Sequence, residues 1–281
     1  MRGAAVAAAL LLWRTDAPLP EGNAYVRGLV DKQRHREAVL DQYTYDLASV
    51  REDLDDAGRV KERETRRYEI FFVKGRPVRR LVEEDGRPLS AARQQREDRE
   101  AREMAEAVRS GRAVTEQPRV RLSAILDRYD FRATAREEIA GRTAIVLEFQ
   151  PRPGDPGLEG GRYLRRLGGR IWVDEAEQEV VRTEITNLAP IKVGSALGAS
   201  VSSLSMRIDF RKVDDAVWLP AEDETLVSGR ALIFKKFRRR FRRTYGNYRR
   251  FSVESAESAS SPAAPSASPI PSPSPVPSPS V

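Results

Sequence analysis

The strongest constraint on the fold is a series of short segments, between about residues 21 and 254, in which apolar and polar residues alternate. Successive side chains of a strand point to opposite faces, so this period of two is typical of half-buried β-strands. Gly, Pro and Asp residues separate the segments, as tight turns require. About ten such segments follow one another, which predicts a mainly β (α+β) fold with an open, curved antiparallel sheet and helices on one side.

Two segments have helical periodicity instead. The first begins near Asn23, a residue type that caps helix N-termini, and its apolar residues form one stripe: Tyr25, Val26, Leu29, Val30, Val39 and Leu40. The second, residues 90–110, is rich in Arg, Glu, Gln and Ala, with opposite charges four apart such as Arg93 and Glu97. Because it has almost no apolar stripe, we expect a solvated helix outside the sheet.

The two ends of the chain differ from the middle. Residues 1–20 start with Met1-Arg2 and an apolar run to Trp13, which is the pattern of a secretory signal peptide and too short to span a bilayer. Residues 255–281 are mostly Ser, Ala and Pro, a composition that cannot bury enough apolar surface to fold. We therefore expect an exported protein with one folded domain, residues 21–254, and a disordered C-terminal tail.

Composition excludes several kinds of active site. The chain has no cysteine and a single histidine, His35, which lies among charged residues on the polar side of the first helix. Thiol nucleophiles, cysteine metal sites and histidine-based triads are therefore excluded or nearly so. Carboxylates such as those at residues 53, 55 and 56, or 83–85, fall at turns, where Asp is favoured for local hydrogen bonding. We expect no catalytic residues, no metal and no cofactor.

A basic strip near the C-terminus is the most unusual local feature. Seven of nine consecutive residues are basic: Lys235, Lys236, Arg238, Arg239, Arg240, Arg242 and Arg243. On a strand, Phe237 and Phe241 share a face with Arg239 and Arg243. Such a strip could bind nucleic acid, bind an anionic membrane surface, or pair with acidic residues of neighbouring strands. Because export makes contact with nucleic acid rare, we expect no nucleic-acid partner.

Several segments together resemble a known family. Residues 169–174 form a strand that ends in Asp, and after a tight turn residues 179–184 return through a Val-x-Arg step. Residues 218–227 and 245–251 look like later strands of the same group, and the first helix followed by Tyr43-Thr44-Tyr45 also fits. From about Asn23 to Val253 the chain therefore resembles the outer-membrane lipoprotein-sorting proteins, that is, the periplasmic lipoprotein-carrier (LolA/LolB-like) superfamily.

This resemblance implies an open antiparallel half-barrel, lidded by helices, whose concave apolar face holds the acyl chains of a lipoprotein or another lipid. The inward residues expected to contact the ligand are Tyr43, Tyr45, Phe72, Ile171, Val173 and Phe210. The charged segment 90–110, the Pro-rich tail and the basic surface depart from the general carrier. The lack of cysteine excludes the lipidated acceptor type.

Three hypotheses follow from the sequence. The first is a non-catalytic cell-envelope protein that binds acyl chains and releases them when the helical lid moves. The second is a structural or interaction protein of the envelope that recruits a partner through the basic strip and the Pro-rich tail. The third, which we favour least, is a hydrolase that acts through paired carboxylates.

Overall fold

The computed structural model describes residues 17–112, 123, 128–153, 161–193, 199–214, 216–231 and 235–250. By contacts between Cα atoms the chain divides into two units, Met1–Arg249 and Arg250–Val281, and all the helices and strands described below begin in the first. Most of the predicted signal peptide and the whole of the predicted tail, residues 255–281, lie outside the described residues. The same holds for four of the five residues of a short helix that we expect at residues 122–126.

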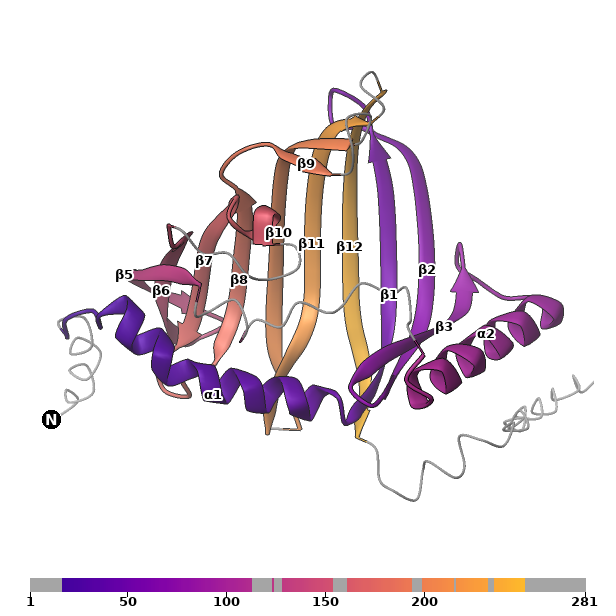
Figure 1. The fold of residues 1–281 in the computed structure, drawn as a ribbon, viewed down its shortest axis with the longest axis horizontal. Coiled ribbons are helices and arrows are strands. Elements are labelled where there is room, and N and C mark those ends of the chain that lie inside the picture. Colours follow the sequence, from indigo (N-terminus) through magenta and orange to yellow (C-terminus); the bar gives the residue numbers. More distant parts are fainter. Residues whose placement is uncertain are drawn as a thin grey trace, which may run out of the picture. The chain divides into compact units, whose positions relative to one another are not determined.

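The first unit is built on one antiparallel sheet of twelve strands (Figure 1). Along the sheet the order is β4-β3-β2-β1-β12-β11-β10-β8-β7-β6-β5, with β9 paired to β10, so the sheet remains open. The strands are β1 Tyr43–Leu54, β2 Val60–Val73, β3 Arg76–Glu84, β4 Arg87–Pro88, β5 Tyr129–Ile139, β6 Arg142–Pro151, β7 Leu167–Asp174, β8 Val180–Asn187, β9 Ile191–Val193, β10 Ala199–Val213, β11 Val217–Ala231 and β12 Lys235–Arg250. The predicted mainly β class and open antiparallel sheet are confirmed.

Local sequence explains most strand boundaries. Hairpin turns fall at Asp85-Gly86 and Ala140-Gly141, where both residues of each pair have positive φ. Pro220 interrupts the alternation, so the sequence predicts two separate strands within residues 217–231. This prediction is wrong. In the structure β11 continues through Pro220, which lies next to a register shift in the pairing with β10. A proline is tolerated at such a bulge because its missing N–H is not needed there.

Helix α1 (Gly22–Leu40) packs on one face of the sheet, which we call the inner face. The predicted apolar stripe is confirmed, since Val26, Leu29, Val30 and Leu40 are all buried. The predicted cap is wrong: the Glu21 carboxylate accepts hydrogen bonds from the first-turn N–H groups. Asn23 instead accepts a hydrogen bond from the backbone N–H of Phe131, at 2.8 Å, and so ties the helix to β5.

Helix α2 (Ala91–Arg109) packs on the opposite, outer face. It begins at the N-cap Ser90 and buries Ala101, Ala105 and Val108 against Val78 and neighbouring apolar residues of β2 and β3. The predicted helix is confirmed and most of its residues are exposed, but it does not lie apart from the sheet, because alanines can bury a helix face without the large apolar residues that mark a stripe. The two long helices lie on opposite faces, so the prediction of helices on one side is also wrong.

Candidate functional site

The inner face carries apolar side chains across nearly the whole sheet. Directly opposite residues of paired antiparallel strands project from the same face, so the strand registers define rows of neighbours. One such row crosses seven strands from β5 to β12: Phe131, Phe149, Gly169, Ile185, Met206, Thr225 and Phe241. In the adjacent rows Leu204 lies opposite Val227, and Ile208 lies opposite Asp223.

Helix α1 covers only part of this face. It runs across one end of the strands, as Figure 1 shows, and its buried residues form a hydrophobic cluster with β5, β6, β7 and β8. The C-terminal end of α1 joins a second cluster with β1, β2, β10 and β11. Several partly buried apolar residues of the central strands belong to none of the hydrophobic clusters that the described residues form. Five of them lie in three consecutive rows of the inner face: Leu204, Met206, Ile208, Val227 and Phe241. We call these five residues the central apolar patch.

Ion pairs border the central apolar patch on the same face. Arg239, opposite Val227, donates a hydrogen bond to Asp53 at 2.6 Å, and Arg51 donates to the same carboxylate at 2.7 Å. Although burial opposes ionisation of Asp53, these two hydrogen bonds hold its pKa below the usual value. The patch is therefore an apolar surface with fixed charges along its border.

On the opposite border Asp223 is buried, and it accepts hydrogen bonds from Arg243 at 3.0 Å and from the Tyr245 hydroxyl at 2.7 Å. Burial raises the pKa of Tyr245, and its hydrogen bond to the Asp223 carboxylate acts in the same direction. Tyr245 is therefore a neutral donor at ordinary pH. The only formal charges in this group are those of Asp223 and Arg243, which neutralise each other.

The polar contacts between α1 and the sheet are concentrated in the C-terminal half of the helix. Gln33 is fully buried and Arg36 nearly so, and Arg36 donates to the carbonyl of Val180 at 2.9 Å. Among the described residues, three buried side-chain oxygens have no hydrogen-bond partner: Gln33 Oε1 and Thr183 Oγ1 at this end of the helix, and the Tyr25 hydroxyl near its other end. Such an atom costs about 1–3 kcal/mol, so both ends of the contact between α1 and the sheet carry an unsatisfied polar group.

The six residues predicted to contact a ligand lie in well-packed parts of the sheet. Tyr43 and Tyr45 are buried in the second cluster, with Phe72 packed against it, and Ile171 and Val173 are buried beneath α1 in the first. Phe210 lies at the register shift between β10 and β11, where Arg36 stacks over its ring at 4.4 Å. Their role in ligand binding stays a prediction. The sequence analysis missed the central apolar patch, although the alternation of residues 204–208 could have indicated part of it.

Four residues of the basic strip are paired with carboxylates. Arg240 and Arg242 lie 3.1 and 2.9 Å from the two oxygens of Glu52 on the outer face, while Arg239 and Arg243 pair with Asp53 and Asp223 on the inner face. The predicted distribution of the strip over two faces is confirmed. The strip therefore does not form a single continuous surface for anionic lipid, because these four arginines point to two faces and are engaged in ion pairs within the sheet.

The acidic clusters of the sequence are similarly engaged. Asp55 accepts from the backbone and side chain of Arg59, and Glu83 pairs with Arg67 at 2.7 Å. Within the described ranges, no three His, Asp or Glu side chains are placed to hold a metal ion. His35 is exposed on α1, as predicted. Neither α1 nor α2, the long helices of the described part of the chain, is apolar enough to cross a membrane.

Comparison with known proteins found no matching family model and no matching curated protein. Among solved structures, a domain from Vibrio parahaemolyticus named for outer membrane lipoprotein sorting is similar at 10% identity, covering 83% of this chain and 93% of that chain with a TM-score of 0.40. A DUF1329 family protein from Desulfovibrio piger is similar at 12% identity, over 83% and 94% of the two chains, with a TM-score of 0.37. A LolA superfamily protein from Nitrosomonas europaea is also similar at 12% identity, over 81% and 94%, with a TM-score of 0.35. Two of these three descriptions name the group that the sequence resembles.

Proposed function

We propose that this protein is a non-catalytic binding protein of the cell envelope that holds an acyl chain of a lipoprotein or lipid on the inner face of its sheet. The observation that carries the proposal is the central apolar patch. Its side chains continue the rows that α1 covers on β5 to β8, yet they join none of the four hydrophobic clusters of the described residues. A bound hydrocarbon chain would complete this packing.

The chemistry of the patch favours an acyl chain over a polar ligand. Its side chains offer no hydrogen-bonding groups except the thioether of Met206, a weak acceptor that adapts to irregular apolar shapes. Burying a CH₂ group contributes about 0.8 kcal/mol, so several methylenes along one row supply useful affinity. The ion pairs at the border would confine the chain to the patch.

Helix α1 is the element that we expect to move. Its N-terminal half is anchored to β5–β8 by the first hydrophobic cluster, whereas Lys32, Gln33 and Arg36 contact the sheet and its turn through hydrogen bonds, which water can replace when the helix moves. Opening at that end would extend access along the inner face without unfolding the sheet. Ligand exchange would then require only local rearrangement, consistent with a carrier or sensor that performs no chemistry.

The alternative of an envelope interaction protein that recruits its partner through the basic strip has less support. Arg239, Arg240, Arg242 and Arg243 form ion pairs with Glu52, Asp53 and Asp223, so four of the seven basic side chains of the strip are already engaged within the sheet. The hydrolase hypothesis also loses support, because the acidic clusters on which it rests bind arginine side chains and turn backbone instead.

The test begins with native mass spectrometry of the full chain after secretion into a bacterial periplasm, followed by solvent extraction of any bound lipid. A stoichiometric acylated species supports the proposal, and the protein mass also shows whether the leader is removed. A clean apo mass, together with no uptake of added fatty acid or acylated peptide, would contradict it.

A matched pair of variants locates the site. Met206→Gln places an amide in the central apolar patch, whereas Ser205→Gln places the same amide one residue away on the outer face. We expect Met206→Gln to weaken binding of a fluorescent fatty acid about tenfold, since an unpaired buried amide costs about 1–3 kcal/mol. Ser205→Gln should bind as the unmodified protein does. Equal affinities for the two variants would place the ligand elsewhere.

A further inference from the structure

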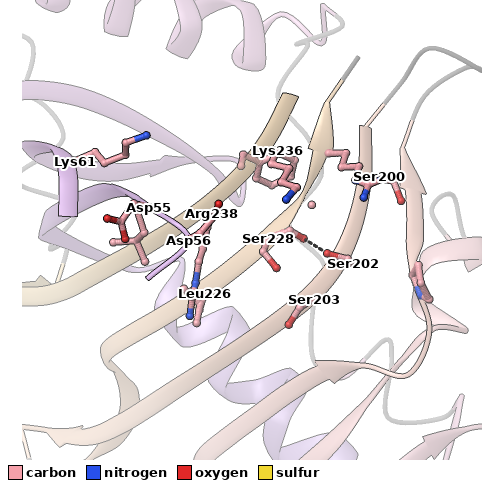
Figure 2. A pocket seen from close by; sticks show the side chains of 15 residues that line it. Asp55, Asp56, Lys61, Ser200, Ser202, Ser203, Leu226, Ser228, Lys236 and Arg238 are labelled. Carbon is pink, nitrogen blue, oxygen red and sulfur yellow. Dashed lines mark hydrogen bonds between the residues drawn. The ribbon is translucent and has the colours of Figure 1, made fainter. Parts of the chain in front are cut away.

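An open pocket of about 780 Å³ lies where the ends of β10, β11 and β12 meet the turn between β1 and β2 (Figure 2). Serine hydroxyls form part of its wall: Ser200, Ser202, Ser203 and Ser228. Ser202 donates a hydrogen bond to the carbonyl of Ser228 at 3.2 Å, which joins β10 to β11 at this point. The pocket therefore combines small hydroxyl groups with apolar side chains such as Leu54, Leu226 and Phe237, whereas the patch of the inner face is apolar throughout.

Strand register aligns these serines with basic side chains on the outer face. One row consists of Ser200, Arg230 and Lys236 on β10, β11 and β12. The next row consists of Ser203, Ser228 and Arg238 on the same strands. Neighbours within a row are about 5 Å apart and neighbouring rows about 7 Å apart, so a small anion between the rows could reach all three cations.

These three cations have no acidic partner within the described residues. Arg230 and Lys236 lie directly opposite each other, and like charges in that position destabilise a sheet. Farther along the same two strands the pattern is reversed, since Glu224 lies opposite Arg242 and Asp223 opposite Arg243. The unneutralised charge is thus confined to the rows that line the pocket.

The two carboxylates on the far side of the pocket, Asp55 and Asp56, form no ion pair with these three cations among the described residues. Asp55 accepts hydrogen bonds from the backbone N–H of Arg59 at 2.9 Å and from its Nε at 2.8 Å, and the backbone bond is the main reason why the pKa of Asp55 is lowered. Asp56 stands beside it and Lys61 faces the same space, as Figure 2 shows. The nearby turn residue Gly58 lies close to Arg238, so the hairpin closes one side of the pocket.

We propose that this pocket binds a phosphate group, held by Arg230, Lys236 and Arg238 and by the serine hydroxyls of β10 and β11. Arginine and lysine provide the charge, and hydroxyls donate to the remaining oxygens, which is the donor set that a phosphate dianion or phosphodiester requires. Its three cations lie in outer-face rows, while Gly229 and Phe237 reach the pocket from an inner-face row. None of the five residues of the central apolar patch lines the pocket, so this site is separate from the acyl-chain site and does not depend on it. The phosphate can belong to a free ion or to a lipid headgroup, and the experiment distinguishes these sources.

The test uses the full chain and the double variant Lys236→Gln/Arg238→Gln. The control is Lys235→Gln, which removes an exposed charge next to Lys236 but on the inner face of the same strand. Binding of inorganic phosphate is measured by isothermal titration calorimetry at constant ionic strength. Binding to phosphatidylcholine vesicles with and without phosphatidic acid is measured by flotation, and thermal unfolding confirms that each variant is folded.

We expect saturable phosphate binding that the double variant weakens at least tenfold and the control changes less than twofold. Binding of free phosphate identifies a soluble ligand, whereas binding only to vesicles that contain phosphatidic acid, lost in the double variant, identifies a headgroup. Ser203→Ala/Ser228→Ala should weaken the same binding severalfold with no change in charge. The proposal is overturned if neither probe binds saturably, or if the control and the double variant weaken binding equally, because the effect would then be general screening.

Discussion

Replacing Asp223 by Asn should destabilise the protein substantially, because this carboxylate is the most deeply buried ion-pair acceptor among the described central strands. Its side chain is 2% exposed, whereas that of its partner Arg243 is 41% exposed. Removing one partner of a fully buried pair costs about 3–5 kcal/mol. Water can solvate part of Arg243, and Asn keeps one acceptor for Tyr245, so we expect a loss of about 2–3 kcal/mol in the free energy of unfolding.

Urea unfolding followed by tryptophan fluorescence measures this loss, because Trp172 and Trp218 are both buried on the outer face. The matched control is Glu148→Gln, since Glu148 pairs with Arg132 at 3.0 Å with both side chains largely exposed, and such pairs contribute less than about 1 kcal/mol. For a folded unit of this size the expected loss lowers Tm by about 4–12 °C. If Asp223→Asn were within about 0.5 kcal/mol of Glu148→Gln, the inference of a buried, mutually dependent charge pair would be wrong.

Three further predictions concern the folded unit. Burial raises the pKa of Glu179 above its ordinary 4.5, so the free energy of unfolding should fall as pH rises from about 4.5 through the raised pKa. Glu179→Gln should remove this fall, and a pH-independent difference in the free energy of unfolding between the two proteins would contradict the prediction. Leu147→Ala should cost about 3–4 kcal/mol, measured by urea unfolding, because Leu147 is fully buried beneath α1; a loss below about 1 kcal/mol would contradict this packing. Gly169→Ala should cost at least about 2 kcal/mol of stability, because the new Cβ would lie 1.9 Å from the Glu184 carbonyl oxygen. Gly28→Ala, in open space on α1, should stabilise the protein by about 0.5–1 kcal/mol. Equal shifts in Tm for the two variants would refute the close approach at Gly169.

Much of the local structure is predictable because it depends on neighbouring residues. The alternation and turn residues predict β2 at residues 60–73, as observed, and the four-residue turn before Glu179. They also predict which residues of β12 share a face, since that requires only the period of two. Errors arise where tertiary contacts override the pattern, as at Pro220, whose missing donor is accommodated by a bulge.

The candidate sites depend on long-range pairing, which the local pattern does not contain. Strand β12 lies between β1 and β11, so Arg239 meets Asp53 across 186 positions of sequence. Alternation places Met206 on a face, but it does not show whether α1 covers that part of the face. For the same reason the sequence could not distinguish the arginines that form ion pairs from Arg238, which has no acidic partner among the described residues. Whether a side chain is available to a ligand therefore depends on the residue that it contacts in the folded sheet, and the residue type alone does not show this.

The distribution of charge pairs explains why a net charge of +7 is a poor guide to the ligands of this chain. On β12, Arg240 and Arg242 share one carboxylate, Glu52, which is itself buried, so these guanidinium groups stabilise the outer face and are not available to a ligand. A few residues away, Arg230 and Lys236 face each other, and neither forms an ion pair among the described residues. A bound anion would relieve their mutual repulsion. The cations of the proposed phosphate site and the acyl-chain site lie on opposite faces of the same three strands, and a variant of either site should leave the other unchanged.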